Sequence, residues 1–386
     1  MRRCEATIML TNSKPHKKER KYKMSDLSKV VILIPSFEPD EKLPKLLNDL
    51  QGYPFEKILI VNDGSDKKFD TVFDECRVFP DVEVIGYEEN RGKGFALKKG
   101  FRYIQEHYPD FKAIVTADSD GQHTPEDIRR TAQTTLENPE KLILGSRSWK
   151  EENVPFRSRY GNKITKAVFK WISGTKVEDT QTGLRGFSPD VVSEFLKTKG
   201  DRFEYEMNML MEARLRHIEI LEIPIETVYI EENKSSHFRP FRDSVKIYSV
   251  FFKHLSKFVI SSMSATVIDF AIYAIMLNAV FGYTEENTSF LDNLTDYRIV
   301  ISFIVARILS SAFNFIINKY VVFKERKRNP KEVAKYYAIV VVVFLCTVLL
   351  NSFFLTIGVA QWLCQPLATF IMFFISYYFQ RVIVFK

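Results

Sequence analysis

Apolar residues are distributed very differently in the two halves of this 386-residue chain. Beyond about Phe258 they form four long runs, at residues 258–281, 299–323, 337–357 and 363–385. About 20 apolar residues in a helix cross the roughly 30 Å hydrocarbon core of a bilayer. The first 245 residues instead carry most of the charged residues and only short apolar runs. The pattern therefore predicts a water-exposed domain followed by four transmembrane helices.

Short apolar runs and helical patterns alternate in the first half. Five runs rich in β-branched residues predict strands at residues 30–34, 58–61, 82–87, 113–117 and 142–144. Helical patterns between them cover residues 43–50, 94–107 and 125–137. This alternation indicates a parallel sheet covered by helices on both faces. In such a sheet the ligand binds outside the carboxyl ends of the strands.

Composition and charge narrow the classes of function. A mean hydropathy of −0.13 averages two unlike halves, and the composition excludes disorder, collagen and a disulfide scaffold. Lys and Arg number 55 and Asp and Glu 48, so the net charge is +7. The cations gather at residues 14–23 and beside the apolar runs rather than as a basic stripe interleaved with aromatics, so nucleic-acid binding is not expected. The four cysteines show no C-x-x-C spacing and predict neither a metal site nor disulfides.

Charges beside the spans predict their orientation. The first connection between spans, residues 282–298, is acidic, whereas the sequences before span one, between spans two and three, and after span four are basic. The positive-inside rule then places both termini, the water-exposed first half and the central connection in the cytoplasm of a multi-pass cell-membrane protein.

The four spans contain an internal repeat. Residues 318–324 read Asn-Lys-Tyr-Val-Val-Phe-Lys and residues 380–386 read Gln-Arg-Val-Ile-Val-Phe-Lys, which predicts two similar hairpins. Asp269, Arg307, Asn314 and Asn318 lie within the spans, where polar side chains normally face the bundle interior or an interface. They form either a path for a polar headgroup or a set of structural pairs, such as Asp269 with Arg307.

Polar motifs follow the predicted strands. The first is Pro35-Ser36-Phe37, and the second is Asn62-Asp63-Gly64-Ser65, in which Asp63 could bind a base or ribose or form a simple turn. The third is Asn90-Arg91-Gly92-Lys93-Gly94, whose glycines and cations suit phosphate although it is not a Walker loop.

The most informative motif is Asp118-Ser119-Asp120-Gly121-Gln122-His123, directly after a strand. Two carboxylates at this spacing can hold Mg²⁺ or Mn²⁺, which would neutralise a departing diphosphate. The alternative is a turn before the helix that begins near Pro125, with Thr124 as its N-cap. Arg147, at the next strand end, is either a phosphate clamp or a surface arginine.

Three further segments follow in order: Asp179-Thr-Gln-Thr-Gly-Leu-Arg-Gly186, Phe203-Glu-Tyr-Glu206 and Glu222-Ile-Pro-Ile225. With the motifs above, they make the chain resemble glycosyltransferase family 2 proteins of the GT-A fold. Within that family it is most similar to the branch of dolichyl-phosphate mannose synthase and bactoprenol glucosyltransferase. The four spans resemble the GtrA-like membrane domain. The resemblance implies an α/β, Rossmann-like nucleotide-diphospho-sugar transferase domain plus an all-α four-helix transmembrane domain.

The resemblance also assigns expected roles. Contacts to the donor nucleotide are expected from Pro35, Phe37, Asp63, Lys93, Asp118 and Ser119. Metal and diphosphate are expected at Asp118, Asp120 and Gln122, with Arg147 on phosphate and Asp120 as the first candidate for any base. This chain has Glu38-Pro39-Asp40 where many relatives have Asn-x-Glu, which leaves open which carboxylate meets the base.

The expected acceptor is a polyprenyl phosphate. Residues 233–239 look like the acceptor loop of that branch, and Arg157, Arg159, Lys234, Ser236 and Arg239 are the candidates to hold the lipid phosphate. Apolar residues near helical spacing with interleaved lysines predict an interfacial amphipathic helix at residues 241–257. In the implied reaction, an oxygen of the polyprenyl phosphate attacks the anomeric carbon of a UDP- or GDP-linked sugar in one inverting displacement. The product is expected to serve cell-wall or surface glycan modification.

The predicted organisation is a basic disordered leader (1–29), a transferase domain (30–240), the interfacial helix (241–257) and the membrane domain (258–386). The leader has no apolar core long enough for a signal peptide, and Met24 is an alternative start. Further copies of the chain are candidate partners in a homo-oligomer. The competing functions are polysaccharide extension, for which the Q-x-x-R-W motif is not found, and a lipid-linked-sugar transporter or flippase with a regulatory nucleotide-binding domain.

Overall fold

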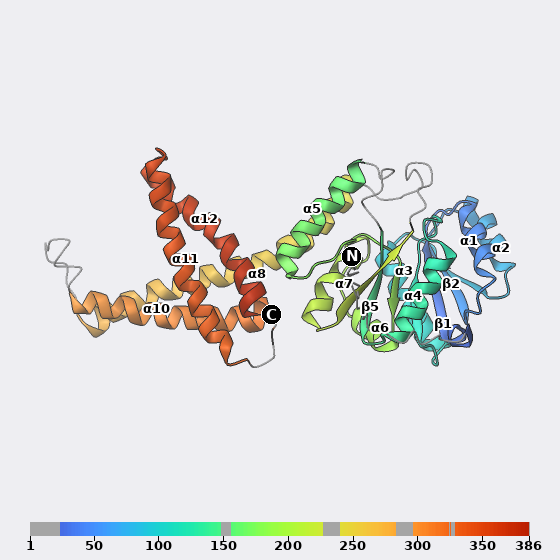
Figure 1. Ribbon diagram of the computed structural model, residues 1–386, viewed down its shortest axis with the longest axis horizontal. Coiled ribbons are helices and arrows are strands. Elements are labelled where there is room, and N and C mark those ends of the chain that lie inside the picture. Colours follow the sequence, from blue (N-terminus) through green and yellow to red (C-terminus); the bar gives the residue numbers. More distant parts are fainter. Residues whose placement is uncertain are drawn as a thin grey trace, which may run out of the picture.

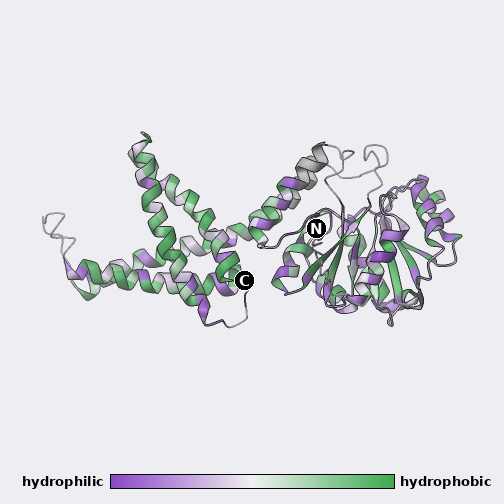
Figure 2. Ribbon diagram, in the orientation of Figure 1, coloured by the Kyte–Doolittle hydropathy of each residue, from purple (hydrophilic) through white to green (hydrophobic). Residues whose placement is uncertain are grey.

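The computed structural model of the chain describes residues 24–147, 156–226, 240–282, 296–323, 325 and 329–385. An α/β domain lies to the right in Figure 1 and a group of long helices to the left. Figure 2 shows the long helices as predominantly hydrophobic, whereas the helices that cover the sheet carry polar residues on their outer sides. The two parts match the division that the apolar pattern predicts. The expected leader up to residue 23 lies outside the described residues.

A seven-stranded sheet forms the first domain, in the order β3-β2-β1-β4-β6-β5-β7. The five predicted strands are confirmed to within a few residues, and two more are present. The strands are β1 (Val30–Ser36), β2 (Lys57–Asp63), β3 (Val82–Tyr87), β4 (Ala113–Thr116), β5 (Lys141–Arg147), β6 (Arg185–Phe187) and β7 (Glu219–Ile225). The expectation of a wholly parallel sheet is wrong, because β6 runs antiparallel between β4 and β5.

Helices cover both faces of the sheet because its central strands are apolar on both sides. Val31 and Leu33 of β1 join the core on one face, and Val30, Ile32 and Ile34 join the core on the other. The helices are α1 (Lys42–Leu50), α2 (Asp70–Arg77), α3 (Lys93–His107), α4 (Pro125–Glu137), α5 (Phe156–Ser173), α6 (Pro189–Phe195) and α7 (Glu204–Leu215), with 3-10 turns η1 (Met24–Lys29) and η2 (Lys67–Phe69). Helices α1 and α4 pack over the second core, whereas α3 and α7 pack over the first.

Four helices are long and apolar enough to cross a membrane, as predicted. They are α8 (Pro240–Ala274), α10 (Tyr297–Ile317), α11 (Lys331–Thr356) and α12 (Gln361–Phe379), extended by π-helical turns η4 (Ile275–Val280), η5 (Asn318–Val322) and η6 (Gln380–Val384). Helix α8 has 35 residues and runs without a break through residue 257, so the predicted interfacial helix and the first span form one helix. At 1.5 Å per residue it is about 52 Å long, which exceeds the hydrocarbon core.

Polar side chains within the spans contact one another. Arg307 lies 3.2 Å from the Asp269 carboxylate, which also accepts a hydrogen bond of 2.7 Å from Ser310. Asn314 donates to the Tyr336 hydroxyl, and Asn318 donates to Gln380 at 3.0 Å. The expected pairing of Asp269 with Arg307 is confirmed, and these contacts are typical of structural pairing.

The two copies of the internal repeat meet at one end of the helices. Asn318 and its repeat counterpart Gln380 form the hydrogen bond just described, and Phe323 stacks on its counterpart Phe385 with ring centres 5.0 Å apart. These aromatic rings belong to the same continuous apolar core as Val31 and Leu33 of the sheet domain. The membrane helices and the sheet domain are therefore joined by packed side chains as well as by the chain itself.

An ion pair between Lys319 and Glu332 is buried at this end of the helices, and both side chains are less than a tenth exposed. Removing one partner leaves an unpaired buried charge, so K319M and E332Q are each expected to lower the free energy of unfolding by about 3 kcal/mol. The double variant K319M/E332L replaces the pair with apolar side chains and is expected to regain most of that loss. Thermal unfolding in detergent measures all three. Equal stability of the single variants and the unsubstituted protein would contradict a structural role.

Candidate active site

The polar motifs lie at the carboxyl edge of the sheet, where parallel strands end together. In the register of the sheet, Ser36 of β1 faces Asn62, and Asp63 of β2 faces Tyr87 of β3. Asp118 follows β4 after one residue, and Arg147 is the last residue of β5. The sequence places these residues far apart, and the sheet brings them to one edge.

Asp63 fixes the loop before α3. Its side chain is buried, and its Oδ1 accepts hydrogen bonds from the Tyr87 hydroxyl at 2.5 Å and from the backbone N–H groups of Arg91 and Gly92 at 2.9 and 3.0 Å. Oδ2 accepts from the Asn90 amide at 3.2 Å. Burial and the hydrogen bond to Asp63 raise the pKa of Tyr87, so the phenol stays a donor. Asp63 therefore holds the chain at residues 90–92 against the end of β2.

The end of β1 carries the other predicted donor contacts. Pro35 belongs to the strand, and Phe37 follows it and is partly exposed. Glu38 adopts a left-handed backbone conformation with φ of 49°, and its N–H donates to Ser65 Oγ at 2.8 Å. The chain after β1 is thus tied to the Asp63-Gly64-Ser65 turn, so the first two motifs form one surface.

Asp118 lies in a cluster of charged side chains. The Lys93 ammonium is 2.7 Å from Asp118 Oδ1 and 3.2 Å from Glu206 Oε2. The buried ring of His123 approaches Asp118 Oδ2 at 3.3 Å. Sequence reasoning expected Lys93 and Asp118 here but missed His123 and the role of Glu206. His123 ends the D-S-D-G-Q-H motif, but nothing in the sequence links Glu206 to Lys93, 113 positions earlier.

Electrostatics separate the two aspartates. Burial raises the pKa of Asp118, but the nearby Lys93 ammonium and the His123 ring outweigh burial and hold it well below its usual range. Burial and the negative charge of Asp118 raise the pKa of Asp120. Although burial lowers the pKa of Lys93, the charges of Asp118 and Glu206 raise it above its ordinary value. The cluster at neutral pH thus contains an ionised Asp118 and a charged Lys93 beside the less acidic Asp120.

The D-x-D turn is also the approach to a helix. Gly121 takes a φ of 73°, and Asp120 Oδ1 accepts from the Gln122 N–H at 3.1 Å. Thr124 caps α4 by accepting from the Asp127 N–H at 3.2 Å, which confirms the predicted N-cap. Because Thr124 makes the cap, Asp118, Ser119 and Asp120 are not needed for it. The structure therefore combines the capping turn with a partly exposed pair of carboxylates.

Arg147 is engaged by an acidic partner. Its guanidinium donates to both oxygens of the fully buried Asp179, from Nε at 2.6 Å and from Nη2 at 3.1 Å. The backbone N–H groups of Glu178 and Asp179 in turn donate to the Glu222 carboxylate at 2.9 and 3.2 Å. Asp179 thus holds the Arg147 guanidinium, a role that its place in the segment Asp179–Gly186 does not reveal.

The expected acceptor residues fall in parts of the chain about which little is described. Arg157 and Arg159 belong to the first turns of α5, but their side chains lie outside the described residues. Lys234, Ser236 and Arg239, with the rest of the expected acceptor loop, also lie outside them. Their roles stay predictions.

Two family models and several known proteins match this chain. The model of "Glycosyl transferase family 2" matches residues 31–196, and that of "GtrA/DPMS, transmembrane domain" matches residues 257–385. UDP-N-acetylglucosamine–dolichyl-phosphate N-acetylglucosaminyltransferase of Methanococcus voltae is 30% identical over 221 residues, covering 52% of this chain and 86% of the relative. Polyprenol monophosphomannose synthase of Mycolicibacterium smegmatis is 24% identical over 207 residues, or 51% and 76% of the two chains. The crystal structure of glucosyl-3-phosphoglycerate synthase from Mycobacterium tuberculosis with uridine diphosphate aligns with a TM-score of 0.45 and 11% identity, over 60% of this chain and 84% of that one.

Gly183 offers a test of how tightly Asp118 is held. A Cβ at this position would lie 2.3 Å from Asp118 Oδ2, and the Gly183 carbonyl accepts from Thr116 Oγ1 at 2.7 Å. The substitution G183A must displace Asp118 from Lys93 and is expected to lower the free energy of unfolding by about 1–3 kcal/mol. The control is G52A, because nothing lies within 4 Å of a Cβ added at Gly52. Thermal unfolding compares the two, and equal midpoints would contradict the close contact.

Proposed function

Because the chain belongs to glycosyl transferase family 2 and carries a GtrA/DPMS transmembrane domain, we propose that it transfers a sugar from a nucleotide-sugar donor to a polyprenyl phosphate at the cytoplasmic face of the membrane. The protein is a membrane glycosyltransferase. The observation that carries the finer proposal is the carboxylate pair Asp118 and Asp120 at the end of β4, with Lys93 beside it. That pair lies where an α/β sheet binds its ligand.

The donor is held along the edge of the sheet. Pro35, Phe37 and Asp63 surround the base and ribose, and Ser119 lies on the diphosphate side. By its name, one relative transfers N-acetylglucosamine from a UDP-linked sugar to dolichyl phosphate, and another is a synthase of polyprenol monophosphomannose. UDP-linked sugars are therefore the first donors to test, and GDP-linked sugars are the second.

The residues at the D-x-D turn fit a hard divalent cation. Asp118 and Asp120 are close enough for the charge of one to raise the pKa of the other, and a cation between them relieves that repulsion. Within the described part of the chain, no group of three or more His, Cys, Asp or Glu side chains is placed to hold a metal. Mg²⁺ keeps few protein ligands and takes the rest from water and substrate phosphate. Asp118, Asp120 and the Gln122 side chain would hold Mg²⁺ or Mn²⁺, which when bound neutralises diphosphate charge.

The chemical step requires little base catalysis. A phosphate monoester is already largely dianionic at neutral pH because its second pKa is near 6. One of its oxygens attacks the anomeric carbon, the bond from that carbon to the nucleoside diphosphate breaks, and a single displacement inverts the configuration. Lys93 contributes positive charge beside the diphosphate, and Arg147 reaches phosphate from its place on Asp179. If a proton must be taken, Asp120 is the first candidate for the base.

The membrane domain brings the catalytic half to the lipid. Arg157, Arg159, Lys234, Ser236 and Arg239 are the proposed contacts to the acceptor phosphate, and the product serves cell-wall or surface glycan modification. Assembly with further copies of the chain is part of the proposal, because the Arg307 side chain is 60% exposed within a span and a charged group facing lipid is costly.

Loss of the Asp120 charge tests the mechanism. The variant D120N keeps the shape of the side chain and is expected to lower the rate of transfer by about 100- to 1,000-fold. The assay supplies UDP- and GDP-sugars, undecaprenyl or dolichyl phosphate and Mn²⁺ in detergent, and identifies the product by mass. The matched control is D74N on α2, an exposed carboxylate paired only with Arg77 among the described residues. Transfer by D120N at the rate of D74N would refute the mechanism, as would full activity after removal of divalent metal.

The orientation is tested by fusions to alkaline phosphatase, which is active only after export. Because the first connection is acidic and the central one basic, we expect activity from a fusion after Gly282 and none from a fusion after Asn329. The opposite pattern would place the catalytic domain outside.

A further inference from the structure

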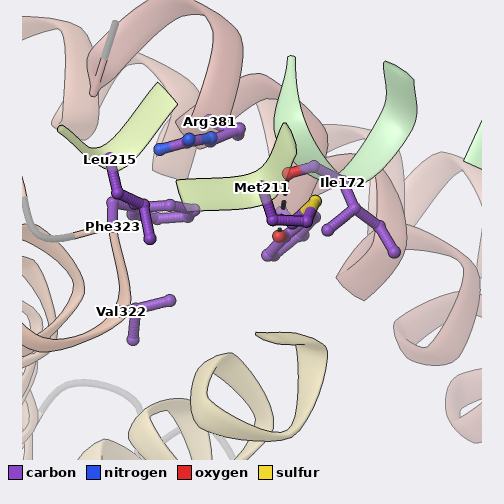
Figure 3. A pocket seen from close by; sticks show the side chains of 7 residues that line it. Ile172, Met211, Leu215, Val322, Phe323 and Arg381 are labelled. Atoms are coloured by element: carbon purple, nitrogen blue, oxygen red, sulfur yellow. Dashed lines mark hydrogen bonds between the residues drawn. The ribbon is translucent and has the colours of Figure 1, made fainter. Parts of the chain in front are cut away.

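The last membrane helix contacts the end of α5. The Tyr377 hydroxyl donates to the Ile172 carbonyl at 3.1 Å, and Arg381 Nε donates to the Ser173 carbonyl at 3.0 Å. Ser173 is the last residue of α5. Figure 3 shows Arg381 beside Phe323 and Leu215, on one side of a small pocket whose other side is lined by Met211 and Ile172. Residues of the sheet domain and of the membrane domain therefore meet around this point.

These two hydrogen bonds provide partners for backbone carbonyl groups at the end of α5, a helix of the sheet domain. The last carbonyl groups of an α-helix have no partner within the helix, and a cation there matches the negative end of its dipole. Arg381 is only 6% exposed, and no carboxylate among the described residues forms an ion pair with it. Its charge is instead placed at the end of α5 and over the Phe323 ring, 5.5 Å from the ring centre. The α5 terminus therefore helps to stabilise the buried guanidinium.

Apolar packing also joins the domains here. Trp171 packs on Phe374 and on Tyr377, with ring centres 5.6 and 5.2 Å apart. Burying a guanidinium is costly, and good hydrogen-bond geometry is needed to repay that cost. Two directed hydrogen bonds orient the end of α5 more specifically than apolar packing does.

The segment after α5 leads directly to the active site. Gly174 ends the helix with a φ of 71°, and its N–H donates to the Lys170 carbonyl. Asp179, six residues beyond Ser173, accepts hydrogen bonds from Nε and Nη2 of Arg147. Gly183, four residues further, packs against Asp118. The segment 174–183 is thus held by the membrane domain at its start and by the site at its end.

We propose that Tyr377 and Arg381 are positioning residues for sugar transfer: by holding the carboxyl end of α5, they fix segment 174–183 against Arg147 and Asp118. The inference rests on the proposed function. It makes the membrane domain part of the catalytic apparatus as well as an anchor. The two side chains act through Asp179 and Gly183 and do not themselves touch substrate.

The experiment compares Y377F, R381M and the double variant Y377F/R381M with Y378F, which removes a hydroxyl from the neighbouring residue that packs on Phe379. We expect Y377F/R381M to lower kcat by about 10- to 100-fold, because small displacements of catalytic groups cost that much. KM for the nucleotide sugar should change less than kcat, because Asp63 and the end of β1, which hold the base and ribose in the proposed function, lie outside segment 174–183. R381K keeps a cation that can donate to Ser173 and should restore most of the kcat lost in R381M.

Hydrogen–deuterium exchange gives a readout that does not depend on activity. Segment 174–183 should exchange faster in Y377F/R381M than in Y378F, while β1 and β2 exchange equally in both. Unchanged exchange in segment 174–183 would overturn the inference. Faster exchange with an unchanged kcat would show that the two side chains hold the segment, but it would overturn their role as positioning residues for sugar transfer. If the unsubstituted protein transfers no sugar to any polyprenyl phosphate, the proposed function fails, and the exchange comparison alone decides whether the membrane domain holds this segment.

Discussion

The candidate active site depends on one ammonium group between two carboxylates. Lys93 is the first residue of α3, and it joins Asp118 after β4 to Glu206 on α7. Buried charges are stable only when they are paired, so the three elements must approach one another for any of these side chains to be buried. The approach is close: a Cβ at Gly94 would lie 2.5 Å from the Tyr205 Cβ. The glycine beside the lysine is what allows α3 to begin so near α7.

This arrangement explains which parts of the site the sequence predicts. Strand ends are predictable, because apolar runs mark the strands and parallel strands end at one edge. Asp63, Asp118 and Arg147 could therefore be placed together. Their partners could not be placed, because Glu206 and Asp179 act through the tertiary fold and carry no periodic signal. The same limit applies to β6, which is only three residues long, and to β7, whose glutamates interrupt the apolar run.

The membrane half was predicted more completely, because a span needs only length and apolar character. What the pattern could not predict is how the two copies of the internal repeat differ. Lys319 of the first copy forms its ion pair with Glu332 inside the membrane domain, whereas its counterpart Arg381 donates to Ser173 of the sheet domain. Asn318 and Gln380, the neighbours of these two cations, still contact each other. The two amide side chains of the repeat thus contact each other, whereas its two cations, Lys319 and Arg381, have partners in different domains.

The contact of Arg381 with the sheet domain affects how a soluble donor and a lipid acceptor can meet. In the proposed reaction the donor binds at the carboxyl edge of the sheet and the acceptor phosphate stays at the membrane surface, so the transfer would require a fixed height of the sheet above the bilayer. A flexible linker would leave that height variable. Here one apolar core runs from Val31 in the sheet to Phe385 at the end of the last span, and α5 contacts α8 beside it. Because packed cores resist displacement, the height is set by the same side chains that stabilise the fold.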